Sequence, residues 1–307
     1  MAKIFIDGSA GTTGLRIRER LSQRSDLQLI TLTEELRKDV NARREALNAA
    51  DVAFLCLPDA AAIEAVSLVD NENTAIIDTS TAHRTNPAWE YGFPELFGRR
   101  ERIKGAKRIA NPGCHASGFV ALVEPLVREG VLSADVALTC TSLTGYSGGG
   151  KKMIAEYEGD ERESLLDAPR MYGLGQTHKH LPEMARICGL ARDPIFCPIV
   201  APYYSGMEVT VPLFVDMING NADTVKEVYR SYYQNGLVRY ADSADESGFL
   251  SAAAFSDRDD MQITVTGNDD RILLVARFDN LGKGASGAAI QNMNLLLGAD
   301  EATGLNI

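Results

Sequence analysis

Apolar and polar positions alternate in two different ways along the first third of the chain. Short apolar runs such as KIFID and ADVAFLCL are separated by segments such as TGLRIRERL, in which apolar residues recur at helical spacing. Strands that are separated by helices in this way predict a parallel, doubly wound α/β sheet with both faces buried. The same reading predicts strands at DLQLITL, TAIID and KRIA, and helices at NARREALNAA and DAAAIEAVSLV, the last with Asp59 placed to cap it.

The pattern changes after Cys114. HASGFVALVEPLVREG has the spacing of a helix, and longer alternating strands follow at VALTCTSL, MEVTVPLFVDM, MQITVTG and RILLVARFD. This predicts a second α+β domain on a mixed or antiparallel sheet, with helices near Lys151 to Glu158 and Ala222 to Asn235. A final helix in GASGAAIQNMNLLLG is expected to pack back on the first domain. We therefore predict one domain of residues 1–113 plus 284–307 and another of residues 114–283.

Composition narrows the functional classes. The chain has 307 residues, 45% hydrophobic and 24% charged, which is typical of a soluble globular protein. No run approaches the roughly 20 apolar residues that span a bilayer, and no signal-peptide pattern opens the chain, so we expect no membrane association and a cytoplasmic location. With 31 Lys and Arg against 42 Asp and Glu, the net charge of -11 argues against a nucleic-acid partner. Five cysteines, widely spaced and without a CxxC pair, indicate reduced thiols.

A glycine-rich turn joins the first predicted strand to the first helix. IFIDGSAGTTGLRIRERL has the spacing G-x-x-G-x-x-G, which by itself is a weak motif and is also compatible with a tight turn and no ligand. At the start of a helix, backbone N–H groups and the helix dipole favour a pyrophosphate. We therefore expect a Rossmann-like dinucleotide site. Its candidate residues are Gly8, Ser9, Gly11, Thr12, Thr13 and Gly14.

The residues after the second strand bear on the choice of cofactor. An NAD site usually has an acidic residue at the end of this strand to bind the ribose hydroxyls. Here Glu34 and Glu35 are displaced past Thr33, and Arg37 and Lys38 follow closely. Cations at this place favour the 2′-phosphate of NADP, so we predict NADP rather than NAD.

One cysteine has the setting of a nucleophile. In ANPGC, Cys114 follows a strand end and a turn and directly precedes a helix, where the local field stabilises a thiolate. Cys56 and Cys140 lie inside strand patterns and are interpreted as small buried hydrophobic residues. We expect Cys114 to act as a nucleophile.

A thiol nucleophile needs a proton acceptor, and two of the four histidines stand close together. His178 and His180 lie in the polar segment GQTHKHLPEM and are candidates for the base, with Glu183 able to orient one of them. His115 adjoins the thiol in sequence, but its side chain is expected to diverge from it. A zinc site of the thiol, both histidines and a carboxylate is an alternative. A metal would quench the thiolate and leave the glycine turn unexplained, so we predict none.

With these features in hand, the chain resembles the N-acetyl-γ-glutamyl-phosphate reductase family in its shorter bacterial form, related in plan to aspartate-semialdehyde and glyceraldehyde-phosphate dehydrogenases. The likeness covers essentially the whole chain. It is carried by IFIDGSAGTTGLRIRERL, IDTSTAHRT, ANPGCHASG, TGYSGGGKKMI, THKHLPEM, APYYSGMEVTVP and DNLGKGASGAAIQNMN. It implies that Cys114 attacks an acyl phosphate of N-acetylglutamate, releases phosphate and forms a thioester, which hydride from NADPH reduces to the semialdehyde in arginine biosynthesis.

The resemblance also implies residue roles. His178 or His180 is the acid/base, without a choice between them, and Asn111 with the N–H of Cys114 binds the oxyanion. Asn280 approaches the nicotinamide carboxamide. The substrate-binding candidates are Arg84, Asn111, Ser147, Gly148 and Glu183. Longer members have an arginine where this chain has Ser205. A homo-oligomer, dimer or tetramer, is expected. Aspartate-semialdehyde dehydrogenase and a non-catalytic dinucleotide-sensing regulator are the alternative functions.

Overall fold

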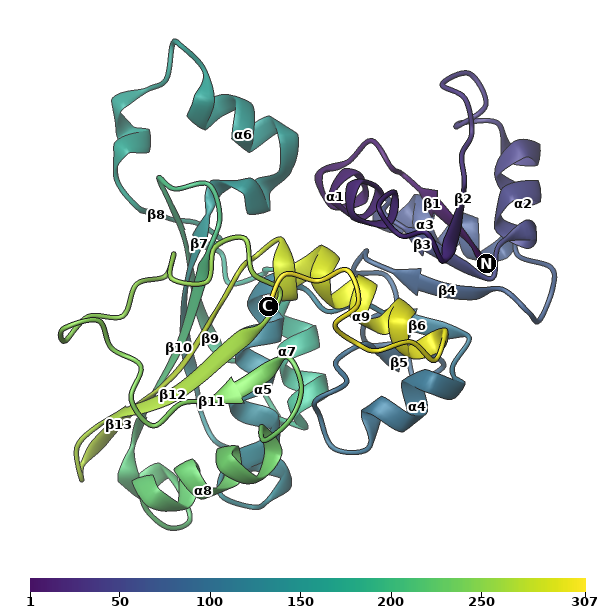
Figure 1. The fold of residues 1–307 in the computed structure, drawn as a ribbon. Helices are drawn as coiled ribbons and strands as arrows, with labels where there is room; N and C mark the ends of the chain where they lie inside the picture. Colours follow the sequence, from purple (N-terminus) through teal and green to yellow (C-terminus); the bar gives the residue numbers. More distant parts are fainter. The chain divides into compact units, whose positions relative to one another are not determined.

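The computed structural model describes all residues from 1 to 307, and these divide into two compact units (Figure 1). Unit 1 consists of Met1–Pro94, Gly98–Pro112 and Ala285–Leu305. Unit 2 consists of Glu95–Phe97, Gly113–Gly284 and Asn306–Ile307. Each unit has its own sheet. The predicted α/β fold class is confirmed, because one sheet is entirely parallel and the other is mixed.

Unit 1 contains a six-stranded parallel sheet in the order β2-β1-β3-β4-β6-β5. Its strands are β1 (Ala2–Asp7), β2 (Leu27–Ile30), β3 (Val52–Leu55), β4 (Ala75–Asp78), β5 (Glu90–Tyr91) and β6 (Arg108–Ala110). Its helices are α1 (Thr12–Leu21), α2 (Val40–Ala49), α3 (Asp59–Ser67), α4 (Arg99–Gly105) and α9 (Gly287–Leu296). The order reverses between β1 and β3, and ligands of doubly wound sheets bind beyond the carboxyl ends of strands at such a reversal.

Alternate residues of β1 show why both faces of this sheet are covered. Ile4 and Ile6 belong to a cluster with Ile17 of α1 and Met293 of α9. Phe5, between them in sequence, belongs instead to a cluster with Leu47 of α2 and with residues of α3. Because successive side chains of a strand point to opposite faces, a continuous apolar run needs helices on both sides.

Unit 2 contains a seven-stranded mixed sheet in the order β11-β12-β13-β10-β7-β9-β8. Its strands are β7 (Thr139–Gly145), β8 (Arg170–Met171), β9 (Ile195–Ala201), β10 (Met207–Phe214), β11 (Val238–Tyr240), β12 (Met261–Gly267) and β13 (Arg271–Phe278). Its helices are α5 (Cys114–Arg128), α6 (Gly150–Glu158), α7 (Leu181–Cys188) and α8 (Ala222–Tyr232). Short 3-10 turns lie at Tyr146–Gly149, Ser164–Asp167 and Val215–Met217, and a π-turn at Gly282–Ser286.

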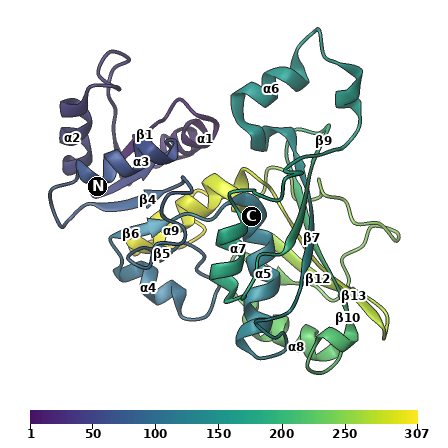
Figure 2. The ribbon, with the colours of Figure 1, turned by 180° about the vertical axis from the view of Figure 1, so that it is seen from behind.

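Helices cover only one face of the sheet of unit 2, as Figures 1 and 2 show from opposite sides. Helix α5 packs on β10 and β13, α8 packs on β12, and α7 packs on α5. Along β10, Val209 and Val211 are buried on this face, while Phe214 lies on the other and is 59% exposed. Ile195 of β9 and Leu273 of β13 share that outer face and are 59% and 40% exposed. The outer face therefore carries three exposed apolar side chains and has no helix over it.

One local prediction was wrong, and one long strand was not predicted. Asp59 does not cap α3: Pro58 stands at the cap, and the Asp59 carboxylate accepts hydrogen bonds from the backbone N–H and the hydroxyl of Thr81. Strand β9 was not predicted, because Pro198 interrupts its apolar run and proline is unusual inside a sheet. The chain tolerates it as an inner strand between β7 and the two-residue β8.

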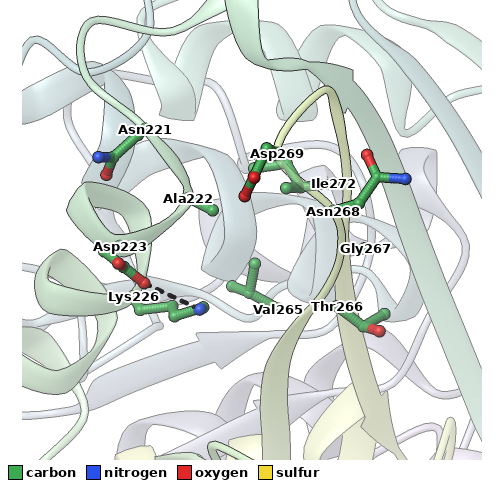
Figure 3. A pocket seen from close by; sticks show the side chains of 10 residues that line it. All are labelled: Asn221, Ala222, Asp223, Lys226, Val265, Thr266, Gly267, Asn268, Asp269 and Ile272. Atoms are coloured by element: carbon green, nitrogen blue, oxygen red, sulfur yellow. Dashed lines mark hydrogen bonds and ion pairs between the residues drawn. The ribbon is translucent and has the colours of Figure 1, made fainter.

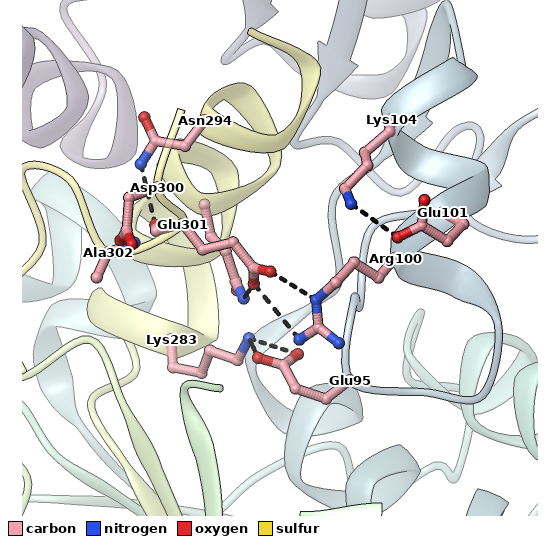
Figure 4. Close-up of polar contacts among 10 residues, drawn as sticks. Glu95, Arg100, Glu101, Lys104, Lys283, Asn294, Asp300, Glu301 and Ala302 are labelled. Atoms are coloured by element: carbon pink, nitrogen blue, oxygen red, sulfur yellow. Dashed lines mark hydrogen bonds and ion pairs between the residues drawn. The ribbon is translucent and has the colours of Figure 1, made fainter. Parts of the chain in front are cut away.

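The most basic run of the sequence, residues 99–108, forms α4 and the start of β6, and the charges of its helical part are paired inside unit 1. Arg99 bonds Glu90, and Arg100 bonds Glu301 at 2.5 Å (Figure 4). The run is a solvated helix face with local ion pairs, which is the usual structure of a run of charged residues. No helix of the chain is long and apolar enough to cross a membrane.

Candidate functional site

The glycine turn after β1 is shaped by close backbone contacts. Gly8 has a φ of +86°, and a Cβ there would lie 2.2 Å from the carbonyl oxygen of Cys56. A Cβ on Gly14 would lie 2.6 Å from the oxygen of Gly8. Both glycines are thus required by the turn itself. Gly11 is different, since its Cβ would meet nothing nearer than 3.6 Å, and the space beside it is open to a ligand.

The start of α1 has the properties of a phosphate site. Gly11 stands at the N-cap, no side chain caps the helix, and the first turn contains no acidic residue. The hydroxyl oxygen of Thr12 is buried without a hydrogen-bond partner. A bound oxygen-rich group would satisfy this hydroxyl and the first N–H groups of the helix. The residues present therefore suit the pyrophosphate of a dinucleotide.

The surroundings of β1 and β2 suit NADP in particular. The carboxylate of Asp7, at the end of β1, is bonded by Arg43 at 3.0 Å, and burial raises the pKa of Asp7 while Arg43 opposes this rise. No acidic residue lies in β2, which ends at Ile30. In the loop that follows, Arg37 pairs with Glu34 at 2.5 Å and its side chain remains 45% exposed. Lys38 is also exposed. An accessible cation is therefore available near the second strand.

Two predicted substrate residues of unit 1 hold backbone just before the thiol in sequence. Arg84 is buried, and it donates to the carbonyl oxygens of Asn111 and Thr79, each at 3.0 Å. The side chain of Asn111 donates to the oxygen of Ala285 and accepts from Asn292 at 3.3 Å. These contacts fix the conformation of the segment that leads to Cys114.

Cys114 is the first residue of α5 and is half-buried. Gly113, at the N-cap, donates its backbone N–H to Oε1 of Glu183 at 2.8 Å, and this carboxylate is almost fully buried on α7. A Cβ on Gly284 would lie 3.1 Å from Cβ of Cys114, so the absence of a side chain at Gly284 lets this loop approach the thiol. A thiol at the start of a helix, where the first N–H groups lack helical acceptors, is in the setting that stabilises a thiolate.

Three of the other four cysteines have thiols whose pKa is raised. None of the five is in a disulfide. Cys140 and Cys188 are buried, and burial raises the pKa of both thiols. Burial likewise raises the pKa of Cys56 to about 12. The interpretation of Cys56 and Cys140 as small hydrophobic residues agrees with these surroundings.

Three histidine rings of unit 2 form one cluster. The ring centroids of His178 and His180 are 4.8 Å apart, and that of His115 lies 5.7 Å from the first and 5.6 Å from the second. Sequence reasoning set His115 apart from the candidate bases, whereas the structure places it among them. It also missed Tyr172, whose hydroxyl is 2.6 Å from Nε2 of His115. His115 lies inside ANPGCHASG and Tyr172 outside every quoted motif, and only the folding of α5 against the segment before α7 brings the two together.

The two candidate bases differ in their hydrogen bonding. Nδ1 of His178 accepts the backbone N–H of His180 at 3.2 Å, so the neutral ring carries its proton on Nε2. Burial and the neighbouring Lys179 lower the pKa of the half-buried His178. His180 is buried at the start of α7. The remaining histidine, His83 of unit 1, bonds Asp78 through Nδ1 at 2.6 Å.

Asn280 and Ser147 are paired inside unit 2. The side chain of Asn280 donates to Oγ of Ser147 and accepts the backbone N–H of Gly206, both at 3.0 Å. A Cβ on Gly148 would lie 3.4 Å from Nδ2 of Asn280. Asn280 is 2% exposed. The structure thus brings three predicted ligand-binding residues together, with Asn280 holding the glycine-rich loop after β7.

No group of three or more His, Cys, Asp or Glu side chains is arranged to hold a metal ion. An open pocket of about 460 Å³ lies in unit 2 between the start of α8 and the turn from β12 to β13 (Figure 3). Its ion pair joins Lys226 to Asp223 at 2.9 Å. It contains none of the residues discussed above, and it offers no nucleophile or histidine.

Comparison with known proteins places these features. Residues 34–106 match the family described as semialdehyde dehydrogenase, NAD binding domain, and residues 114–280 match semialdehyde dehydrogenase, dimerisation domain. The chain is 45% identical to N-acetyl-gamma-glutamyl-phosphate reductase 2 of Nostoc sp., over 99% of both chains. It is 47% identical to N-acetyl-gamma-glutamyl-phosphate reductase of Brucella ovis, over 96% of this chain and 99% of the relative.

Solved structures share the fold at low identity. Aspartate semialdehyde dehydrogenase II from Vibrio cholerae has a TM-score of 0.72 and 16% identity, covering 97% of this chain and 98% of that one. Aspartate semialdehyde dehydrogenase from Francisella tularensis has a TM-score of 0.71 and 14% identity, covering 97% and 100%. At this identity the likeness concerns the fold alone.

Proposed function

This chain belongs to the N-acetyl-γ-glutamyl-phosphate reductase family, and from that premise we propose that Cys114 is the nucleophile of its reaction. The protein is an NADP-dependent oxidoreductase of arginine biosynthesis that reduces N-acetyl-γ-glutamyl phosphate to N-acetylglutamate 5-semialdehyde and phosphate. The observation that carries the proposal is the position of this half-buried thiol at the first turn of α5, in the unit that holds the histidine cluster.

In the first step Sγ of Cys114 attacks the acyl carbon of the substrate. The bond from this carbon to the phosphate oxygen breaks, inorganic phosphate leaves, and a thioester remains on the cysteine. When bound, NADPH supplies the hydride that reduces this acyl group. The carbon–sulfur bond then breaks, the semialdehyde is released and the thiolate is restored. Sulfur suits this division into two steps, because a thioester carbonyl accepts hydride more readily than an ester carbonyl.

The residues of unit 1 that would hold NADPH are those of the glycine turn and the loop after β2. Gly8, Ser9, Gly11, Thr12, Thr13 and Gly14 lie at the start of α1, and the unpartnered hydroxyl of Thr12 supports a ligand there. Arg37 and Lys38 provide cations for the 2′-phosphate. Residues 1–113 with 284–307 are thus proposed to form the cofactor domain, and residues 114–283 the substrate and oligomer domain.

The histidine pair supplies the acid/base. Because Nδ1 of His178 already accepts a backbone N–H, its ring presents Nε2–H and acts as a hydrogen-bond donor to substrate oxygen. We assign the exchange of the proton with the thiol to His180. Glu183 holds the N–H of Gly113 and so fixes the turn before the thiol.

The remaining candidates position and bind the substrate. The N–H of Cys114 lies in the first turn of α5, where it suits a developing oxyanion, and Asn111 is proposed to support it. Arg84 is proposed to bind the phosphate or carboxylate of the substrate in addition to the carbonyls it holds. Ser147 and Gly148 are proposed to contact phosphate. Asn280 is proposed to act on the nicotinamide side while it anchors Ser147.

The protein forms an oligomer, as the matched dimerisation domain indicates. We propose a homodimer in which the outer face of the sheet of unit 2 is the contact. Ile195, Phe214 and Leu273 are large apolar side chains exposed together on this face, and exposed apolar patches mark interaction sites. We also propose a cytoplasmic location, which suits five cysteines without a disulfide.

One assay tests the function directly. The purified protein is given N-acetylglutamate semialdehyde, phosphate and either NADP or NAD, and reduced cofactor is measured. We expect turnover with NADP, weaker turnover with NAD, and little with aspartate semialdehyde as the matched substrate control. Absence of turnover with the acetylated substrate would reject the assignment, and a regulator that only senses dinucleotide would bind NADP without turnover.

The same assay tests the nucleophile. Cys114→Ala should abolish turnover, and intact-mass spectrometry should detect an acyl adduct on the wild-type protein that this variant lacks. Cys197→Ser, a half-buried cysteine of β9, is the matched control and should keep both. Full activity of Cys114→Ala would eliminate the thioester mechanism.

A further inference from the structure

Three side chains of unit 2 form a hydrogen-bonded row that the proposed chemistry does not use. Oγ of Ser142, on β7, lies 2.7 Å from Nδ1 of His115, and Nε2 of the same ring lies 2.6 Å from the hydroxyl of Tyr172. Ser142 is fully buried and His115 is 3% exposed. Each of the three groups can donate or accept a hydrogen bond. Which group donates to which follows from the number of hydrogens that each one carries.

A neutral imidazole has one nitrogen that donates and one that accepts. Burial and, to a smaller extent, the nearby His178 together lower the pKa of His115 to about 3, so this ring is neutral at physiological pH. Two arrangements of hydrogens are then possible. Either Nδ1 donates to Ser142 and Nε2 accepts from Tyr172, or Nδ1 accepts from Ser142 and Nε2 donates to Tyr172.

The buried serine decides between them. The only hydrogen-bond partner of the Ser142 hydroxyl is the ring of His115. If Nδ1 carried the hydrogen, the hydroxyl hydrogen of Ser142 would be buried without an acceptor, which costs about 1–3 kcal/mol. The arrangement that satisfies every buried hydrogen has Ser142 donating to Nδ1 and Nε2 donating to Tyr172. The hydroxyl oxygen of Tyr172 then accepts, and its own hydrogen points elsewhere.

The ring of Tyr172 lies beside the histidine cluster. The ring of Tyr172 contacts that of His178 at 5.9 Å between centroids. Burial and, to a smaller extent, the charge of Cys114 raise the pKa of Tyr172, so the phenol keeps its hydrogen. The only hydrogen-bond partner of the Tyr172 hydroxyl is His115, which donates to it in this arrangement. No group of the chain accepts the hydroxyl hydrogen of Tyr172.

We infer that Tyr172 donates its hydroxyl hydrogen to an oxygen of the bound acyl-phosphate substrate, and that His115 is the positioning residue that turns this hydrogen toward it. The inference rests on the proposed function. The acceptor is either the acyl oxygen or a phosphate oxygen, which share the same chemistry as hydrogen-bond acceptors. Ser142 fixes the tautomer of His115 by donating its hydroxyl hydrogen to Nδ1.

The direction of the row is tested without turnover. Nitrogen NMR of the full chain with labelled histidine separates a protonated ring nitrogen from an accepting one, and the spectrum of His115→Gln identifies the signals of His115 among the four histidines. We expect a neutral ring with hydrogen on Nε2 and an accepting Nδ1. Ser142→Ala should reduce this preference. Hydrogen on Nδ1 in the wild-type protein would overturn the inference.

Kinetics then test the contact with substrate. Tyr172→Phe should lower turnover about 10- to 100-fold, since a hydrogen bond to a charged or reacting oxygen is lost, with unfolding unchanged. Tyr232→Phe, on α8, is the matched control and should leave turnover unchanged. In the reverse reaction, a rise confined to the KM of phosphate identifies a phosphate oxygen, whereas a fall in kcat with both KM values unchanged identifies the acyl oxygen.

His115→Gln and Ser142→Ala should shift the same kinetic constant as Tyr172→Phe, by a smaller factor, because they disturb only the orientation of the phenol. Wild-type turnover of Tyr172→Phe would overturn the inference while leaving the proposed function intact. Failure of the wild-type protein itself to turn over would instead count against the function, and the NMR result would stand separately.

Discussion

The backbone N–H of Gly113 donates to Oε1 of Glu183 at 2.8 Å, although 70 positions separate the two residues. This bond ties the residue before the proposed nucleophile to α7, the helix that begins directly after the histidine pair. The carboxylate is 1% exposed, so the turn before Cys114 is held by a buried acceptor. Glu183 therefore positions the thiol of Cys114 by holding the backbone of the preceding residue, Gly113.

Removing this acceptor should weaken both folding and activity. Glu183→Ala leaves the N–H of Gly113 buried without a partner, which should cost about 1–3 kcal/mol of unfolding free energy. Glu183→Gln keeps an oxygen at the same place and should lose less. Urea unfolding and turnover measure these effects. Glu156→Gln, exposed on α6, is the control, and equal stability of Glu183→Ala and wild type would contradict the positioning role.

Replacing His178 and replacing His180 should have different effects on the reactivity of Cys114 and on turnover. His180→Asn should slow the alkylation of Cys114 by iodoacetamide and abolish most turnover, because the proton acceptor of the thiol is lost. His178→Asn keeps a donor and should alkylate at nearly the wild-type rate while turnover falls about 10- to 100-fold. Rates of alkylation at fixed pH, with and without substrate as protectant, distinguish them. The reverse order of effects would assign the base to His178.

Cofactor preference should depend on the loop after β2. Arg37→Ala should weaken NADP binding about tenfold and leave NAD binding nearly unchanged, because only the 2′-phosphate is lost as a partner of the guanidinium. Binding is measured by titration calorimetry without substrate. Arg44→Ala, a partly exposed arginine of α2 that pairs with Asp70, is the matched control. An equal loss for both cofactors would place Arg37 outside the 2′-phosphate site.

Acid should destabilise the protein through His115. Its pKa falls from 6.5 in the unfolded chain to about 3 in the folded protein, so the unfolded state binds the proton first. Folding stability should therefore decrease as pH falls from about 6.5 toward about 3. Urea unfolding at pH 7 and pH 5 measures the loss. His115→Gln removes this contribution, and an equally steep loss in that variant would show that other groups, such as His178, account for it.

Charge on the outer face of unit 2 should break the proposed dimer. Phe214→Asp combined with Leu273→Asp places two carboxylates where apolar side chains would pack against a second copy. Sedimentation velocity should show a smaller particle than the wild type. Leu174→Asp changes a leucine that is 75% exposed before α7 and serves as the control. An unchanged particle would move the contact to another surface.

Features that depend on residues close together in the sequence were predictable, and features that depend on residues far apart in the sequence were not. The turn of Gly8 and Gly14, the start of α5 at Cys114 and the alternation of buried strand residues arise from backbone sterics and periodicity within a few positions, so the sequence alone determined them together with the family. Pro198 hid strand β9, because its place inside a sheet depends on neighbours that are remote in the chain.

The row of Ser142, His115 and Tyr172 and the bond from Gly113 to Glu183 join residues 27 to 70 positions apart. No local pattern encodes such pairs, because they form only when separate elements pack and each buried polar group must find a partner. Tertiary structure therefore decided which buried polar groups lie within hydrogen-bond distance of one another. The sequence by itself had settled the family, the alternation of strands and helices, and the presence of a thiol, histidines and a glycine turn.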